Sequence, residues 1–467
     1  MTTRPVVIAG AGPCGLVAAL TLEKSAGIPY IIYEKTTADK LCSNAGSGID
    51  MAPTAIEILD DQLGLADKDW MKPYEYMHLA DMKGNKLALL DLKSLKLKKV
   101  SERRSFGFAN RSGLQHALLD TLNLKDDDGN IKIDDDRLRC NASVVGYQNM
   151  DDFVRVELND GTKVDASALL ACDGIHSAVR KQMHREVDDP LNYCGQECWW
   201  GKTTVKPGSE LDNELRRLIA SEKNIAEADG NTSIIAIGTK NKPGAFFSCE
   251  IAPNEHAWGY VLANKTPPTA NASNDLTRRG GSVLTAEEKK REIDDMVTGC
   301  SKVLKLIVQQ PSPGEITRAG FFDRKNLNLS YIDGRVALLG DSAHPQSPMM
   351  GQGANMAIVD GYVAATRLSA AMKDSSCSGS VEQALSDYDS KVRRKENNIV
   401  IKKARRYGKW GASKNRFHCF LARVALKYMS ASTVVSEMVS GDKSNQKFVG
   451  AMREDLQLKK EVNNAHM

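Results

Sequence analysis

The sequence predicts an α/β protein in which a parallel nucleotide-binding sheet is interrupted by an antiparallel sheet and followed by helices. Three observations predict this fold. Residues 6–34 follow a strand–helix–strand pattern with a glycine-rich turn after the first strand. Residues 233–263 have the alternation and polar turns of short antiparallel strands. A buried apolar strand returns at residues 336–339, so the nucleotide domain is discontinuous and assembled from separate blocks of sequence.

The opening of the chain places a glycine triplet between a strand and a helix. Val6–Ala9 is a short apolar strand, and the apolar pattern of Leu16–Lys24 is helical. Between them, Gly10 permits a tight turn, Gly12 lets the backbone approach a pyrophosphate, and Gly15 lets helix and strand pack closely. The unpaired N–H groups and the positive dipole at the start of the helix favour a phosphate there.

Glu34 closes the second strand, Tyr30–Tyr33, and lies 19 residues after Gly15. A carboxylate at about this distance can hydrogen-bond ribose hydroxyls, as in Rossmann-type domains. A glycine-rich turn without a ligand would account for the glycines alone. The strand, the helix and the acid in their expected places favour dinucleotide binding. Because Glu34 would repel a 2′-phosphate, the site favours FAD or NAD over NADP.

The later elements alternate between helices, hairpins and short apolar strands. Because 467 residues are many for a single core, we expect two domains. In order, we expect a helix at 111–122, a hairpin at 153–164, a strand at 168–171, antiparallel strands at 233–239, 245–251 and 258–263, a surface loop at 264–281, a helix at 286–308 and a strand at 336–339.

Two further motifs follow buried strands. Ala171-Cys172-Asp173-Gly174 ends the strand at 168–171. Gly340-Asp341-Ser342-Ala343-His344 ends the strand at 336–339 and leads to Gly351-Gln352-Gly353-Ala354-Asn355. With the glycine triplet, these motifs resemble the three signatures of the aromatic-hydroxylase group of FAD-dependent monooxygenases, which includes para-hydroxybenzoate hydroxylase. The resemblance spans roughly residues 5–370.

The resemblance implies that FAD is bound non-covalently and assigns a role to each motif. The acid of the first motif would hold the adenosine ribose, Asp173 would serve the FAD pyrophosphate and the visiting nicotinamide cofactor, and Asp341 would bind the ribityl chain. A second helix would point its N-terminus at the flavin and stabilise the negative charge of the reduced ring. The implied cofactor-binding residues are Gly10, Gly12, Gly15, Glu34, Gly48, Arg111, Asp173, Asp341, Gly351, Gly353, Ala354 and Asn355.

Each motif also has a purely structural interpretation. Asp341 has the residue type of a helix N-cap, Arg111 that of a surface helix residue, and Asp173-Gly174 that of a turn. The chain also departs from its relatives, because Leu41-Cys42-Ser43-Asn44 stands where a loop arginine is usual and Lys40 is the nearest cation. Met349-Met350, before the last motif, suits either a pocket lining or packing.

The activity implied by the resemblance is that of a single-component monooxygenase. Only one dinucleotide fingerprint is present, so FAD would occupy it permanently and NADH or NADPH would bind transiently. The flavin would take a hydride and react with O2 to form a C(4a)-hydroperoxide that hydroxylates or epoxidises a small apolar or aromatic substrate. His176, His256 and His344 each have a structural interpretation, so no acid–base residue is nominated.

Other functions are compatible with the same cofactor motifs. A flavin halogenase would need a Trp-x-Trp-x-Ile-Pro segment, which the chain lacks. A flavin-dependent reductase or saturase of an isoprenoid and a catalytically silent FAD-bound interaction protein stay open. The mass of the product separates the first of these from a monooxygenase, and NAD(P)H oxidation tests the second.

The domain boundaries follow from these blocks. We expect an FAD-binding domain at 1–185 with small contributions to the second domain near 70–110, a substrate-covering sheet domain at 186–322, a closing FAD-binding block at 323–375 and a basic helical region at 376–467. Trp199-Trp200 and Phe246-Phe247 fall in the second domain, where they line an aromatic pocket or pack in its core.

The composition excludes several classes of protein. Hydrophobic residues make up 42% and charged residues 26%, as in ordinary globular proteins. No apolar stretch approaches the roughly 20 residues of a membrane span. The ten cysteines are scattered, with no zinc-like spacing, which indicates no metal site and a reducing, cytoplasmic location.

The charge is concentrated near the C-terminus. Thirteen Lys/Arg and one acid, Glu396, give residues 391–427 a charge of +12, so the rest of the chain carries −8. Apolar residues recur there at helical spacing, at Phe417, Phe420, Leu421, Val424 and Tyr428. Either residues 391–428 make a salt-sensitive contact with an anionic membrane, or the apolar face packs on the FAD domain and the charges are solvated or paired. No recognition motif indicates nucleic-acid binding.

Overall fold

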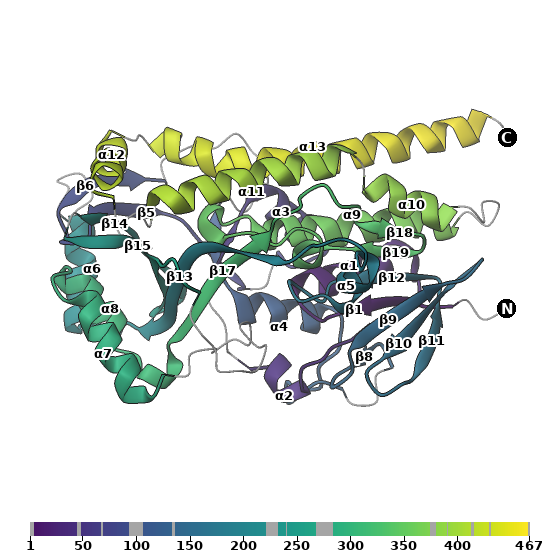
Figure 1. The fold of residues 1–467 in the computed structure, drawn as a ribbon, viewed down its shortest axis with the longest axis horizontal. Helices are drawn as coiled ribbons and strands as arrows, with labels where there is room; N and C mark the ends of the chain where they lie inside the picture. The colour runs from purple at the N-terminus through teal and green to yellow at the C-terminus, as the bar shows by residue number, and fades with distance from the viewer. Residues whose placement is uncertain are drawn as a thin grey trace.

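Four short apolar segments pair as parallel strands and form the centre of the nucleotide domain in the computed structural model (Figure 1). The structure describes residues 4–43, 48–66, 69–92, 106–132, 136–220, 232–239, 241–267, 284–373, 380–389, 391–411, 415–428 and 431–465. The first sheet has the order β18 (Ile332–Asp333), β19 (Val336–Leu338), β12 (Ala168–Ala171), β1 (Val6–Ala9), β2 (Tyr30–Tyr33) and β8 (Leu138–Arg139).

The register of this sheet joins distant parts of the chain. Val6 lies opposite Tyr30 on one side and Ala168 on the other, and Leu169 lies opposite Val336. Only β18, which forms a hairpin with β19, runs antiparallel in this sheet. Every residue of β1 and β12 is buried, so these strands are near-continuous apolar runs, as expected for a sheet covered on both faces. The predicted discontinuous nucleotide fold is confirmed.

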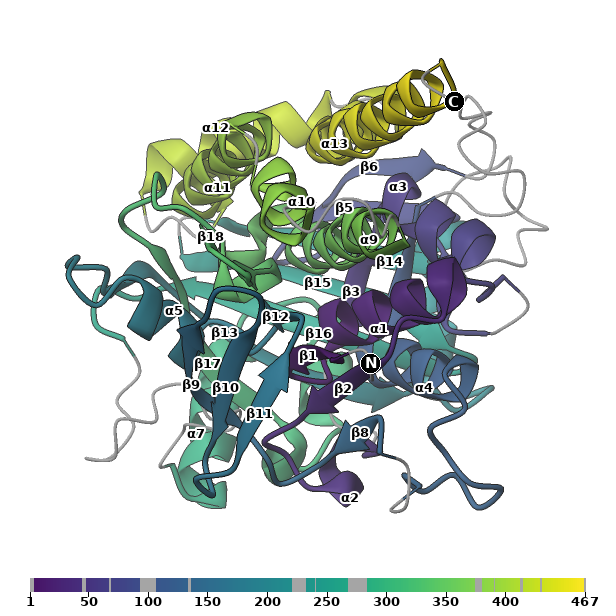
Figure 2. The same ribbon diagram turned by 90° about the vertical axis from the view of Figure 1, so that its right-hand side faces the viewer.

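Helices and a small sheet cover the two faces (Figure 2). The helix α1 (Pro13–Ala26) packs against α9 (Gly353–Lys373) and α4 (Arg111–Thr121) on one face. The predicted hairpin is present on the other face as β10 (Val154–Leu158) and β11 (Lys163–Ala166), and β9 (Val144–Asn149) extends it to three strands. The short helices of this domain are α2 (Ala38–Leu41), α3 (Pro53–Glu57) with the π-helical turn Ile58–Gln62, and α5 (Ala178–Met183).

A seven-stranded sheet forms the second layer. Its order is β17 (Thr317–Arg324), β13 (Leu191–Thr204), β16 (Glu255–Ala263), β15 (Lys242–Ala252), β14 (Thr232–Thr239), β5 (Tyr76–Asp81) and β6 (Lys86–Asp91). Neighbouring strands are antiparallel except β14 and β5. The three predicted strands at 233–263 are present, whereas β13 was not predicted. A third sheet, also not predicted, has the order β3 (Gly48–Met51), β7 (Gly107–Asn110) and β4 (Met71–Pro73). It contacts α9 through β3 and β15 of the seven-stranded sheet through β4 and β7.

The helix predicted at 286–308 is wrong as a single element. It is divided into α7 (Ala286–Val297) and α8 (Lys302–Gln309). Gly299 has φ +77°, which a continuing helix cannot accommodate, and the Ser301 side chain accepts a hydrogen bond from the N–H of Leu304 as the N-cap of α8. These two helices and α6 (Glu210–Ala220) cover one face of the seven-stranded sheet, over a core that includes Trp199 and Phe246.

The C-terminal helices lie along one side of the molecule, at the top of Figures 1 and 2. They are α10 (Ser380–Tyr388), α11 (Lys391–Gly411), α12 (Arg416–Lys427) and α13 (Ala431–Ala465). Phe448, Val449 and Met452 of α13 belong to the core of the nucleotide domain. No helix in the described part of the chain has both the length and the apolar composition of a membrane span. The loop predicted at 264–281 falls mostly outside the described residues, which end at 267 and resume at 284.

Candidate cofactor and substrate site

The glycine triplet forms a tight turn with room on one side. Gly10 has φ +100°, and a Cβ there would lie 2.6 Å from the carbonyl oxygen of Cys172. A Cβ on Gly15 would lie 2.0 Å from the carbonyl oxygen of Gly10. A Cβ on Gly12 would meet no atom within 4 Å among the described residues. The outer two glycines are therefore required by packing, and the middle one leaves open space at the N-terminus of α1, where a pyrophosphate fits.

Glu34 lies beside this turn and holds it. Its side chain is buried, one carboxylate oxygen accepts a hydrogen bond from the N–H of Ala11 at 2.7 Å, and the other accepts from the N–H of Thr36 at 2.8 Å. The carboxylate is fixed at the end of β2 by these bonds. These bonds show a structural role that the sequence did not indicate, and the predicted contact with a ribose stays a prediction.

The two carboxylate oxygens of Asp173 differ in their hydrogen bonding. Its Oδ2 accepts a hydrogen bond from the N–H of Ala178 at 3.0 Å, while its buried Oδ1 has no hydrogen-bond partner in the described part of the chain. Burial raises the pKa of this carboxyl, and the hydrogen bonds from residues 177–179 oppose the rise. A buried acceptor without a partner is costly, so a ligand that donates a hydrogen bond here would be stabilised.

Asp341 and Arg111 are 230 positions apart in sequence, and the fold brings their charges together. Asp341 follows β19 in a short 3₁₀ turn, Gly340–Ser342, and its side chain is exposed. The surrounding protein raises the pKa of Asp341 by desolvation, while the positive charges of His344 and Arg111 lower it. Arg111 is the first residue of α4, whose N-cap Asn110 accepts a hydrogen bond from the N–H of Ser112. The pair supplies an anion and a cation to the same region.

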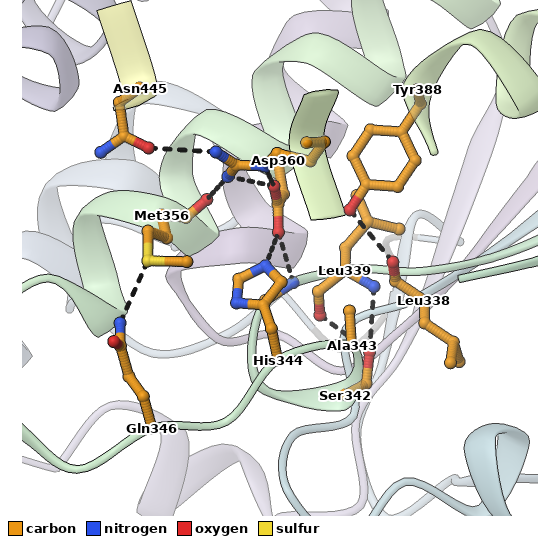
Figure 3. Close-up of polar contacts among 12 residues, drawn as sticks. Leu338, Leu339, Ser342, Ala343, His344, Gln346, Met356, Asp360, Tyr388 and Asn445 are labelled. Carbon is orange, nitrogen blue, oxygen red and sulfur yellow. Dashed lines mark hydrogen bonds and ion pairs between the residues drawn. The ribbon is translucent and has the colours of Figure 1, made fainter. Parts of the chain in front are cut away.

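A buried carboxylate on α9 holds the turn that carries Asp341 (Figure 3). The Oδ2 of Asp360 accepts hydrogen bonds from the N–H of Gly340 at 2.9 Å and from Nε2 of His344 at 2.5 Å. Its Oδ1 accepts from the guanidinium of Arg393, on α11, with Nε at 2.9 Å. Burial opposes ionisation, but the Arg393 and His344 charges hold the pKa of Asp360 at about 2. The sequence motifs did not indicate a role for Asp360, and the charge pattern left open whether the cations of residues 391–428 are solvated or paired. Arg393 is fully buried and paired.

Arg180 fastens the second motif to the third. Its guanidinium donates from Nη1 to the carbonyl oxygens of Ser342 at 3.0 Å and Ala343 at 2.6 Å, and from Nε to Asp189 at 2.7 Å. Arg180 is buried, so these bonds fix the separation between the turn of Asp173 and the turn of Asp341. The sequence did not predict this role for Arg180.

The loop before α9 is held against β3 by Asn355. Its buried Oδ1 accepts a hydrogen bond from the N–H of Ala52 at 2.8 Å, and its Nδ2 donates to the carbonyl oxygens of Asp50 and Gly351 at 2.9 and 2.8 Å. Gly351 has φ +61°, and a Cβ there would lie 2.4 Å from a carboxylate oxygen of Asp50. The helix begins at Gly353, and Ala354 is half-buried in its first turn. The amide of Asn355 therefore positions the loop.

Asp50 and Tyr74 form a hydrogen-bonded pair beside this loop. The Tyr74 hydroxyl donates to Oδ1 of Asp50 at 2.5 Å, and the Cys249 thiol lies 4.0 Å from the same hydroxyl. Burial raises the pKa of Asp50, although the Tyr74 hydrogen bond lowers it. Burial and the neighbouring carboxylate raise the pKa of Tyr74 well above its usual value. A carboxylate with a raised pKa in such a place is suited to exchange a proton.

The seven-stranded sheet presents its second face to this region. Trp200 and Met349 pack against a cluster of Cys198, Val261 and Phe321. Phe247 packs edge-on against Phe108 of β7 with ring centroids 6.3 Å apart. Because residues alternate along a strand, Trp199 and Phe246 face the core beneath α6–α8, whereas Trp200 and Phe247 lie on the opposite face of the sheet. There Trp200 shares its cluster with Met349 of the loop before α9, and Phe247 packs on the cluster that contains Tyr74 and Phe108. The predicted aromatic residues thus divide between the core and the site.

Three other predicted features have mainly structural surroundings. A Cβ on Gly48 would lie 1.8 Å from the ring of Phe108, so packing alone requires a glycine there. Lys40 is exposed, and the backbone of Leu41 and Cys42 accepts hydrogen bonds from α4, while Asn44 lies outside the described residues. His256 is buried, which lowers its pKa to about 4, and it lies 3.4 Å from the hydroxyl of Ser248.

Comparison with known proteins agrees with this geometry. The FAD binding domain family matches residues 3–194 and 229–400, which is more than half of the chain. The aurachin C monooxygenase/isomerase of Stigmatella aurantiaca is 25% identical over 440 residues, covering 93% of this chain and 96% of that protein. The 3-hydroxybenzoate 6-hydroxylase 1 of Aquipseudomonas alcaligenes is 28% identical, covering 78% of this chain and 80% of that protein.

Solved structures share the fold. HpxO of Klebsiella pneumoniae, solved as a complex with FAD and uric acid, superposes with a TM-score of 0.71 over 94% of this chain and 97% of its own, at 19% identity. The open space at Gly12, the partnerless oxygen of Asp173 and the cation beside Asp341 are the features of this structure that fit FAD.

Proposed function

Because this chain belongs to the FAD-dependent monooxygenase family of aromatic hydroxylases, we propose that it hydroxylates or epoxidises a small apolar or aromatic substrate, with NADH or NADPH as reductant. The observation that carries the proposal is the apolar face of the seven-stranded sheet, where Trp200 and Met349 of the loop before α9 pack on one cluster and Phe247 packs against Phe108 of β7. FAD supplies the oxygen chemistry when bound, and the protein binds, orients and shields the substrate.

The cofactor-binding residues in this proposal are those of the three motifs. The turn of Gly10, Gly12 and Gly15 would take the pyrophosphate at the N-terminus of α1, with Glu34 at the adenosine ribose. Arg111 and Asp173 would lie along the phosphates and Asp341 at the ribityl chain. The N-terminus of α9, at Gly353, would direct its positive dipole toward the ring system. Asn355 and Asp360 would act indirectly, by fixing the loop and the turn.

Asp50 and Tyr74 are the residues best placed to handle a proton of the substrate. The pair lies between the loop of Gly351 and the Cys249 side of the sheet. The ionised carboxylate of Asp50 would accept the proton of a ring hydroxyl, while Tyr74 keeps its own proton and orients the carboxylate. The relative from A. alcaligenes is named for a hydroxybenzoate, which supports a substrate with an aromatic hydroxyl.

A screen of aromatic compounds tests the proposal. The FAD-loaded protein is mixed with NADH or NADPH and with each compound, including 3-hydroxybenzoate, and cofactor oxidation is followed under ¹⁸O2. We expect slow oxidation without substrate, faster oxidation with a suitable compound and one labelled oxygen atom in the product. Catalase added in parallel measures any peroxide released by uncoupled turnover.

The other outcomes separate the alternatives. Cofactor consumption with neither labelled product nor peroxide contradicts the monooxygenase function. A product that has gained hydrogen without oxygen indicates a reductase or saturase. Failure of both NADH and NADPH to reduce the bound flavin indicates a protein without this catalytic cycle.

A further inference from the structure

The helix α12 presents its apolar side outward. Phe417, Phe420 and Val424 of α12 and Tyr428, which directly follows it, are 63%, 54%, 37% and 78% exposed, and we call them the α12 apolar stripe. Their spacings of three, four and four residues place them on one side of the helix, at about 100° of rotation per residue. Four of the seven large hydrophobic residues that are exposed in the described structure lie in this short segment, so the exposure is concentrated.

The opposite side of α12 attaches it to the protein. Cys419, about 145° from the centre of the stripe, is buried, and the helix contacts β14, β5 and β6 at the edge of the seven-stranded sheet. The sequence left open whether the apolar residues pack on the FAD domain. The packing interpretation is wrong, because the helix packs through its other side on the second sheet.

The neighbouring helix α11 separates its cations into two groups. On the inner side, Arg393 pairs with Asp360, Arg394 with Asp389, and Arg405 with Asp323. These arginines stabilise the fold, so part of the +12 charge is compensated internally.

The outer side of α11 carries Lys395, Lys402, Arg406 and Lys409, all exposed, which we call the α11 cation stripe. Their spacings of seven, four and three residues again describe one side of a helix. The acid of this helix, Glu396, instead accepts a hydrogen bond from the Ser444 hydroxyl of α13 at 2.7 Å and pairs with Lys447. On α12, Lys427 is exposed beside Tyr428.

We propose that the α12 apolar stripe and the α11 cation stripe form a docking surface for an anionic lipid membrane. The two helices contact each other and lie with α13 along one side of the molecule (Figures 1 and 2). Aromatic and aliphatic side chains enter the boundary between headgroups and acyl chains, and lysine and arginine attract acidic headgroups. The positive charge of the α11 cation stripe favours an anionic surface over a neutral one. The contact would be peripheral and sensitive to salt. This inference does not depend on the proposed catalytic function.

Flotation of the full-length, FAD-loaded protein with vesicles tests the proposal. Vesicles of phosphatidylcholine alone are compared with vesicles of phosphatidylcholine and phosphatidylserine, at low and high salt. We expect the protein to float with the anionic vesicles at low salt and to remain below in the other conditions. The variant F417S/F420S/Y428S should lower the floated fraction by about tenfold or more, and K402E/R406E/K409E should do the same.

Matched variants control for general effects of polarity and charge. V145S/V187S removes exposed hydrophobic residues elsewhere, and K163E/K181E/K325E reverses exposed cations elsewhere. Both controls should float as the wild type does. Far-ultraviolet circular dichroism and flavin absorbance verify that each variant is folded.

Several results would overturn the proposal. One is wild-type protein that remains at the bottom with anionic vesicles at low salt. Another is equal flotation of F417S/F420S/Y428S and the wild type. A third is light scattering that shows a dimer which this variant converts to a monomer, without flotation of either; this would assign the stripe to a second copy of the chain.

Discussion

Asp360 contacts the first residue of the segment 340–351, Gly340, and Asp50 lies beside its last residue, Gly351. The surroundings of the two carboxylates shift their pKa values in opposite directions. Asp360 receives hydrogen bonds from Gly340, His344 and Arg393, so its charge is compensated and its pKa is about 2. Asp50 receives one hydrogen bond from Tyr74, and burial raises its pKa. The compensation of the Asp341 charge is intermediate between these two, because desolvation raises its pKa while His344 and Arg111 oppose the rise.

The difference in surroundings distinguishes a carboxylate with a structural role from one suited to proton exchange. A buried carboxylate with a full set of donors is rigid and stays ionised, so it suits a structural role. A buried carboxylate with one neutral donor has a raised pKa and holds its charge less firmly, so it suits proton exchange. Three substitutions test this comparison, ordered by the expected effect on the free energy of unfolding of the FAD-loaded protein.

The largest effect is expected from Asp360→Asn. It removes the negative partner of a fully buried Arg393 and should lower the free energy of unfolding by about 3–5 kcal/mol. Because the folded pKa of Asp360 is lowered, its contribution is complete above the usual value of 3.8 and is lost as pH falls toward about 2. Denaturant unfolding of both proteins at several pH values measures this.

A surface ion pair provides the control. Asp165→Asn breaks the pair with Arg155, whose side chains are 38% and 39% exposed, and should cost only about 0–1 kcal/mol. If Asp360→Asn costs no more than this control, Arg393 has another source of compensation and the structural role of Asp360 is wrong.

An intermediate effect on the free energy of unfolding of the FAD-loaded protein is expected from Asp341→Ala, because this substitution should weaken FAD binding. Loss of a hydrogen bond that a ribityl hydroxyl donates to the carboxylate should weaken FAD binding by about 1.5–3 kcal/mol, while the apoprotein stays folded. Occupancy is measured from the absorbance ratio of flavin to protein after dialysis, and Asp151→Ala, an exposed aspartate in a turn, is the control. Full occupancy in Asp341→Ala would remove Asp341 from the cofactor site.

The parts of the fold that were predicted have local causes. The strands at 6–9, 30–33 and 168–171 are short apolar runs followed by Gly10, Glu34 and Cys172-Asp173, so composition and motif were sufficient to identify them. The strand β13 was missed because its pairing with β17 shifts register between Tyr193 and Glu197 and its composition alternates poorly. Gly299 did indicate the break between α7 and α8, but the apolar periodicity on both sides masked it.

The site was predicted where residues belong to a motif and missed where partners are distant. Asp360 and Arg393 are 33 residues apart on two helices, and the only sequence signal was an acid within the apolar run 356–365. Asp50 lies in β3 and Tyr74 directly follows β4, in the sheet that was not predicted. Helical spacing identified the apolar side of α12, but spacing does not determine whether that side faces the protein or the solvent.

The smallest effect on the free energy of unfolding is expected from Asp50→Asn. Unlike Asp360→Asn, this substitution should stabilise the protein at neutral pH. A raised folded pKa means that the protonated carboxyl is favoured by folding below the usual value of 3.8 and that this advantage is lost as pH rises through the folded pKa. The variant should therefore match the wild type at low pH and be slightly more stable at neutral pH, which denaturant unfolding across pH measures. Tyr74→Phe removes the hydrogen bond that lowers the pKa of Asp50, so it should move this transition, and the acidic limb of the activity profile, to higher pH. A stability difference between Asp50→Asn and wild type that does not vary with pH would show that Asp50 is not the titrating carboxylate, and the contrast with Asp360 would fail.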